Sequence, residues 1–120
     1  MKNLSILFVS IIILLFSSTS YAKDEIEVNI YIKDHKFYPD QLELPSGHKI
    51  RITIYNQDST IEEFESPDLK REKIIPGLSK ATIILAPLKV GVYKFYGEFN
   101  EDTAKGSIII KDSLEEAENV

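Results

Sequence analysis

The chain has 120 residues, a net charge of −5 at pH 7, no cysteine and a single methionine, Met1. This length is enough for one small domain. An acidic surface repels phosphate backbones and anionic lipid headgroups, so we do not expect binding to nucleic acid or to a membrane surface. Without cysteine there is no disulfide and no thiolate, so the domain must depend on its apolar core.

Residues 1–22 have the pattern of a signal peptide. Lys2 precedes an apolar run from Leu4 to Phe16, and Ser20-Tyr21-Ala22 supplies small residues around a cleavage position. The run is shorter than the roughly 20 residues that span a bilayer. The sequence therefore predicts export to the periplasm with cleavage after Ala22 and no membrane insertion afterwards. The alternative, an uncleaved anchor helix, is less favoured because the serines after Phe16 end the apolar run early.

The remaining chain alternates apolar and polar residues with period two, which is typical of half-buried strands. The pattern is clearest at Ile26–Ile32 and Ile50–Ile54. Further strands are expected at 37–44, 60–65, 80–86, 91–97 and 107–111, with turns at 45–47 and 76–77. No helical period extends over ten residues. We therefore predict an all-β sandwich of about seven or eight strands, with a domain at 23–111 and an acidic flexible tail at 112–120.

Two sets of side chains have a structural interpretation. The mixed charges of Lys70–Lys73 are expected to form a solvated surface. Five aromatic residues at alternating positions are expected to supply the buried area of the core: Phe37, Phe64, Tyr93, Phe95 and Phe99.

Several short motifs, in this order and spacing, resemble the cupredoxins. They are Phe37-Tyr38-Pro39, Leu42–Gly47, Asn56 with Glu62-Glu63-Phe64, Pro76-Gly77, Gly91–Asn100 and Gly106–Ile110. The chain is similar in particular to small periplasmic cupredoxin-like proteins associated with bacterial iron uptake. The resemblance implies a Greek-key β-sandwich whose ligands gather at one end.

The same resemblance implies where copper ligands would stand, and this chain departs from the pattern at each position. The two histidines, the cysteine and the methionine of copper-carrying members fall on Glu62, Asn100, Gly97 and Ala104. None of these four residues offers sulfur or imidazole. A blue-copper centre is therefore excluded.

Other donors remain near that end. We predict that His35, Glu62 and Glu98 form a metal site of modest affinity, because one imidazole with two carboxylates suits Fe, Mn, Zn or Cu(II). The alternative is a surface histidine with solvated glutamates. Adjacent residues of a strand face opposite sides, so only one of Glu62 and Glu63 can face the site, and the position match favours Glu62.

The resemblance implies an accessory of bacterial iron or copper uptake beside a membrane iron permease, which binds a metal ion or helps to oxidise it. Catalysis by the chain itself is not expected, and a metal-dependent oxidation of ferrous iron is the activity to look for if there is one. The alternative is a metal-free interaction module that docks to a membrane transport component through the loop end of the sandwich.

Overall fold

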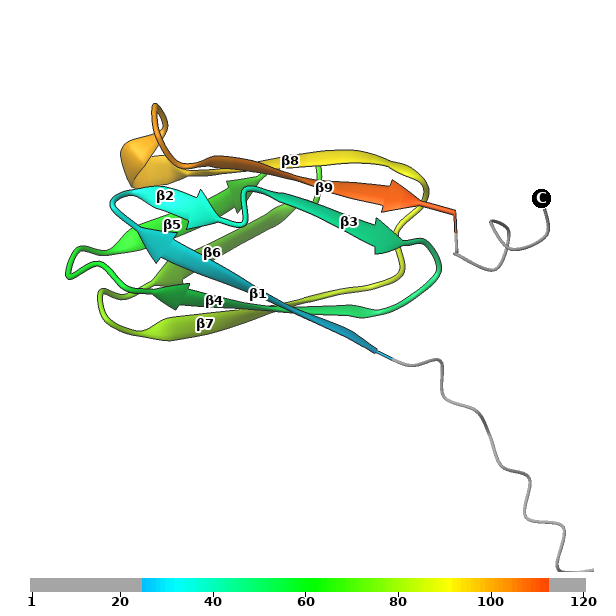
Figure 1. Cartoon of the computed structure of the whole chain (residues 1–120), viewed down its shortest axis with the longest axis horizontal. Coiled ribbons are helices and arrows are strands. Elements are labelled where there is room, and N and C mark those ends of the chain that lie inside the picture. The colour runs from blue at the N-terminus through cyan, green and yellow to red at the C-terminus, as the bar shows by residue number, and fades with distance from the viewer. Residues whose placement is uncertain (1–24, 113–120) are drawn as a thin grey trace, which may run out of the picture.

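The computed structural model describes residues 25–112, which form nine strands and one short 3-10 turn (Figure 1). In chain order the elements are β1 (Ile26–Lys33), β2 (Lys36–Tyr38), β3 (Gln41–Pro45), β4 (Ile50–Asn56), β5 (Glu62–Ser66), β6 (Arg71–Ile75), β7 (Lys80–Leu85), β8 (Gly91–Gly97), η3 (Glu98–Asn100) and β9 (Lys105–Lys111). Within this range no helical segment has the length and apolarity needed to span a bilayer. The predicted signal peptide at 1–22, and the tail beyond Asp112, lie outside the described residues.

The strands form two sheets that pack face to face (Figure 1). One sheet has the order β2-β1-β4-β7, and the other has the order β3-β9-β8-β5-β6. Two pairs are parallel, β1 with β4 and β3 with β9, and the remaining neighbours are antiparallel. The predicted all-β sandwich is confirmed.

Alternation in the sequence accounts for the core. In β4 the side chains of Ile50, Ile52 and Ile54 are fully buried while the residues between them are half-buried. Three rings pack between the sheets: Phe64 stacks on Phe95 with centroids 5.0 Å apart, and Phe37 meets Phe95 edge-on at 5.1 Å. Such buried aromatic pairs contribute about 0.5–1.5 kcal/mol beyond their burial.

Three expectations need correction. The described residues form nine strands, not seven or eight, for two reasons: part of the predicted charged surface pairs with β5 as the edge strand β6, and the stretch predicted as one strand at 37–44 forms two strands, β2 and β3, that lie in different sheets. Four of the five residues of β6 are exposed, so the strand has almost no apolar pattern. Phe99 is 51% exposed and does not belong to the core, because the 3-10 turn after Gly97 ends the alternation of β8. The strand predicted from Thr60 begins at Glu62.

Candidate functional site at the loop end of the sandwich

The loops that follow β1, β4 and β8 meet at one end of the sandwich, on the left in Figure 1. We call this region the loop end. Asp58, from the loop after β4, accepts hydrogen bonds from the backbone N–H groups of Asp34 at 2.9 Å and His35 at 3.0 Å. Asp34 and His35 have φ angles of 51° and 58°, a left-handed conformation that is unfavourable without such support. The Asp58 carboxylate therefore holds the turn between β1 and β2.

His35 lies at the surface of the loop end. Its side chain is 46% exposed, and Nδ1 lies 3.6 Å from Oδ2 of Asp58. Its carbonyl oxygen accepts a 2.6 Å hydrogen bond from the hydroxyl of Thr103, which precedes β9. The residue thus joins three loops through its backbone and leaves its imidazole close to Asp58.

Glu62, the first residue of β5, is only 2% exposed and faces the interior, as predicted. Oε1 accepts hydrogen bonds from the N–H of Glu63 and the N–H of Phe99, both at 3.0 Å. Oε2 accepts one from the Asn100 side-chain amide at 2.7 Å. A buried carboxylate is costly unless donors surround it, and here three N–H groups do so.

The loop that faces Glu62 is closed on itself by backbone hydrogen bonds. Gly97 N–H donates to the Ala104 carbonyl at 2.9 Å, and Ala104 N–H donates to the Asn100 carbonyl at 2.8 Å. A Cβ atom at Gly97 would lie 2.6 Å from Cδ of Glu62 and 2.8 Å from Cβ of Ala104, well inside van der Waals contact. Glycine is therefore required at position 97 as long as Glu62 keeps its place.

These contacts bring together the four positions at which the resemblance implies copper ligands. Glu62 contacts Gly97 and Asn100, and Ala104 contacts the same two residues. The four positions offer a carboxylate that is already hydrogen-bonded, no side chain at Gly97, an amide used as a donor at Asn100 and a methyl group at Ala104. The Glu62 carboxyl group fills the space beside Gly97, where the sulfur-bearing side chain would begin. The residues present do not fit a type 1 copper ion.

The predicted trio of His35, Glu62 and Glu98 is placed at the loop end but is not gathered around one point. Among residues 25–112, the group of carboxylate or imidazole donors with ligand atoms all within 4.8 Å of one another is Glu63, Glu65 and Glu72. The side chain of Glu98 is exposed, and its charge acts on Glu65 and Tyr96, on the outer side of β5 and β8. Joint binding of one ion by the trio stays a prediction.

The acidic group was missed by sequence reasoning. Glu63 and Glu65 lie on the face of β5 opposite to Glu62, and Glu72 stands directly across from Glu65 on β6. Burial and the negative charges of Glu72, Glu63 and Glu98, with a hydrogen bond to Glu63, raise the pKa of Glu65 from 4.5 to about 7. Burial and the charges of Glu98 and Glu65 also raise the pKa of Tyr96. Strand alternation was enough to place Glu63 and Glu65 on one face of β5. The approach of Glu72 could not be predicted, because strand β6 was not expected.

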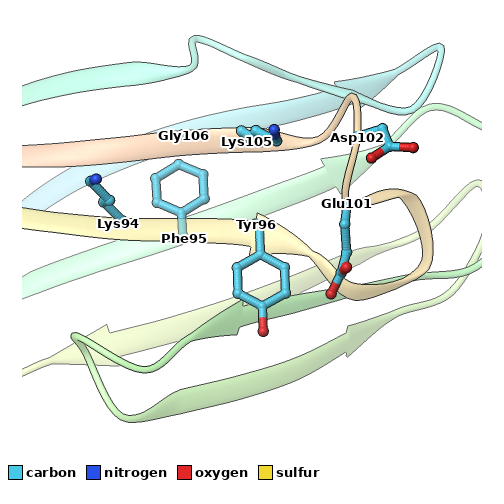
Figure 2. A pocket seen from close by; sticks show the side chains of 7 residues that line it. All are labelled: Lys94, Phe95, Tyr96, Glu101, Asp102, Lys105 and Gly106. Atoms are coloured by element: carbon cyan, nitrogen blue, oxygen red, sulfur yellow. The ribbon is translucent and has the colours of Figure 1, made fainter.

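An open depression of about 450 Å³ is lined in part by Tyr96 and lies between β8, β9 and the loop that joins them (Figure 2). Lys94 and Lys105 line it together with Glu101 and Asp102. In Figure 2 the Tyr96 ring and the Glu101 carboxylate extend to the same side of the ribbon. Two cations and two carboxylates give no dominant charge, so the depression selects no charged ligand class.

The chain has a similar relative among curated proteins. A curated protein of Rickettsia prowazekii (strain Madrid E), "Uncharacterized protein RP394", is 48% identical over 110 residues, which is 89% of this chain and 88% of the relative.

Solved structures with the same fold include copper proteins. The metal binding domain of the Cu(I) exporting P-type ATPase CopA of Streptococcus pneumoniae D39, solved with Cu(I), has a TM-score of 0.64 at 17% identity and covers 78% of this chain and 92% of that domain. Auracyanin A, a "blue" copper protein of Chloroflexus aurantiacus, has a TM-score of 0.63 at 9% identity, and the match covers 73% of this chain and 100% of the auracyanin chain. At these identities the likeness shows the fold alone.

The model of the cupredoxin-like domain family matches residues 5–110, which is most of the sequence. The two-sheet sandwich and the meeting of the four ligand positions at its loop end are as the resemblance implied. This chain therefore belongs to the cupredoxin-like domain family.

Proposed function

We propose that this protein is an exported, periplasmic accessory of bacterial metal uptake that acts by docking to a membrane transport component and holds no copper ion of its own. The observation that carries this proposal is the Glu62 carboxylate. It is buried at the place where the family holds its ion, and it is bonded to three N–H groups. Because the Glu62 carboxylate occupies this interior position and is already hydrogen-bonded, the outer surface of the loop end is the part that is free to bind a partner.

That surface is apolar at three points. Ile61 is 49% exposed, Leu78 is 75% exposed and Phe99 is 51% exposed. The N–H of Leu78 donates to the Asp58 carbonyl at 2.8 Å, so the turn before β7 belongs to the loop end as well. These three side chains offer apolar contact area to another protein at the loop end, although Ile84, Val90 and Val92 are exposed elsewhere on the sandwich.

The partner class follows from the family resemblance and from one structural neighbour. The resemblance is to cupredoxin-like proteins associated with iron uptake, and the neighbouring domain from Streptococcus pneumoniae is part of a copper-exporting ATPase. In that protein the same fold works within a membrane transporter. A membrane iron permease complex is the partner that we propose for this chain.

The second candidate is direct binding of an iron or copper ion by His35, Glu62 and Glu98. All three residues belong to loops or strand ends that meet at the loop end, which favours it. An ion shared by these residues would require Glu62 to release its hydrogen bonds with Phe99 and Asn100. Oxidation of ferrous iron is open only to this candidate, since no side chain of the chain cycles electrons.

A docking experiment tests the proposal. The tagged protein is used to capture detergent-solubilised membranes of the source cells with EDTA present, and captured proteins are identified by mass spectrometry. We expect a metal permease to be retained by the wild-type protein and by His35→Ala, and to be lost with Phe99→Asp or Leu78→Asp. Val92→Asp is the matched control, since Val92 is 57% exposed near the opposite end of β8.

Two results would count against docking by the loop end. One is loss of the permease with Val92→Asp as well as with Phe99→Asp. The other is retention that disappears with EDTA or with His35→Ala, together with calorimetric binding of Fe(II), Fe(III) or Cu(II) tighter than about millimolar, which would favour the second candidate.

A further inference from the structure

We propose that the Glu62 carboxylate takes the place of the family's metal ion as the centre that organises the loop end, and that the surrounding pocket has become an anion pocket. This inference concerns the isolated chain and does not depend on the docking partner. It follows from which groups converge on Glu62, from what lies beside Gly97 and from how the loop between β8 and β9 is held.

Within residues 25–112, three N–H groups donate hydrogen bonds to the Glu62 carboxylate. The N–H of Glu63 comes from β5, and the N–H of Phe99 and the amide Nδ2 of Asn100 come from η3. Their positive ends point at the position of the carboxylate. A cation would require acceptors at the same place, so the polarity of this pocket is opposite to that of a metal site.

The carboxylate joins the same parts of the fold that a bound ion would join. Its hydrogen bonds connect β5 to the turn after β8, two segments far apart in the sequence. Asn100 carries the connection further, because its carbonyl accepts hydrogen bonds from the N–H groups of Ala104 at 2.8 Å and Thr103 at 3.2 Å. One carboxylate thereby ties β5 to the loop from Gly97 to Ala104, which backbone hydrogen bonds close on itself.

Gly97 and Glu62 exclude the alternative arrangement. Any side chain at position 97 would begin 2.6 Å from Cδ and 2.7 Å from Oε2 of Glu62. A cysteine at this position and the inward carboxylate of Glu62 cannot both be accommodated. The absence of Cβ at Gly97 is the steric condition for the internal carboxylate.

Chemical rescue tests the anion pocket. Glu62→Ala leaves a small void and leaves the three N–H donors without an acceptor. A small free carboxylate ion, such as acetate or formate, can fill the void and accept the three hydrogen bonds. We expect Glu62→Ala to have a lower Tm than the wild type, and sodium acetate or formate to raise that Tm by about 5 °C or more at saturation. Sodium chloride at the same ionic strength should not have this effect, and CuSO4 should not raise the Tm.

Glu63→Ala is the matched control, since Glu63 precedes Phe64 on the same strand but lies on the outer face. It should show no rescue by acetate. Glu62→Gln provides a second variant that keeps the volume filled, so acetate should leave its Tm unchanged. If Glu62→Ala does not fold alone, recovery of folded protein on refolding in acetate, and not in chloride, is the supporting result.

Three results would overturn the proposal. Glu62→Ala could be as stable as Glu63→Ala, which would mean that the carboxylate organises nothing. Acetate could stabilise Glu62→Ala no more than chloride does. Copper could raise the Tm of Glu62→Ala while acetate does not, which would show that the pocket still favours cations.

Discussion

Glu62 and Glu65 lie on the same short strand, β5, and differ in almost every physical respect. Glu62 faces inward, is almost completely buried and has three N–H donors around its carboxylate. Glu65 faces outward beside Glu63 and directly across from Glu72, so its neighbours carry the same charge. The partners of a carboxylate, and not the number of acidic residues nearby, decide whether it stabilises the fold or repels its surroundings.

The largest effect is expected from removing the inner carboxylate. Glu62→Ala leaves three donors unpaired in the interior, and we expect the free energy of unfolding to fall by about 3–5 kcal/mol. The outer neighbour is the control, and Glu63→Ala should lower the free energy of unfolding by no more than about 0.5 kcal/mol, because it removes one of several like charges. Urea unfolding followed by circular dichroism measures both. Equal losses in the two variants would remove the distinction between the faces.

A smaller loss is expected from filling the space beside Glu62. Gly97→Ala places Cβ at 2.6 Å from Cδ of Glu62, and overpacking of this kind costs about 1–3 kcal/mol. Gly47→Ala is a useful contrast, because nothing lies within 4 Å of a Cβ there and any loss would come from its positive φ of 81°. The amide signals of Phe99 should shift in Gly97→Ala and stay in place in Gly47→Ala. Unchanged stability of Gly97→Ala would show that the loop can move away from Glu62 freely.

Asp58 resembles Glu62 in using its carboxylate to bind backbone N–H groups, but it does so nearer the surface. Asp58→Ala removes two acceptors from the left-handed turn at Asp34 and His35, and we expect a loss of about 1–2 kcal/mol. Asp58→Asn keeps one acceptor oxygen and should recover part of the loss. Urea unfolding of the two variants checks this order. An Asn variant less stable than the Ala variant would contradict it.

The smallest effect is expected on the outer face, and it depends on pH. The pKa of Glu65 is raised from 4.5 to about 7, so between these values the folded chain binds more protons than the unfolded chain. The stability that protonated Glu65 contributes to the folded chain is complete below pH 4.5 and is lost as the pH rises through about 7. Glu65→Gln should therefore have a higher Tm than the wild type at pH 8 and the same Tm at pH 4.5. A Tm difference that does not change with pH would contradict this account.

The strands with strong alternation could be predicted from the sequence, and the loop end only in outline. Ile50, Ile52 and Ile54 specify a buried face of β4 without any tertiary information. Strand β6 could not be predicted because its residues are nearly all exposed and its existence depends on pairing with β5. Phe99 was expected in the core, since a local sequence pattern does not show that a 3-10 turn follows Gly97.

The candidate site shows the same limit. Position matching and strand alternation were enough to predict that Glu62 faces inward. The same reasoning could not predict that Phe99 N–H and the Asn100 amide would bond to the two oxygens of Glu62. Those donors come from a turn that lies 37 and 38 residues further along the chain. The environment of His35 was also beyond local prediction, since Asp58 and Thr103 approach it from other loops.

A carboxylate, and not a metal ion, organises the loop end of this cupredoxin-like protein. The most direct measurement is a two-dimensional amide NMR spectrum of the purified protein before and after one equivalent of CuSO4. We expect the signals of Glu63 N–H, Phe99 N–H and the Asn100 side-chain amide to keep their positions and widths. Selective broadening of these three signals by paramagnetic Cu(II) would place copper beside Glu62 and would show that the loop end still holds a metal ion.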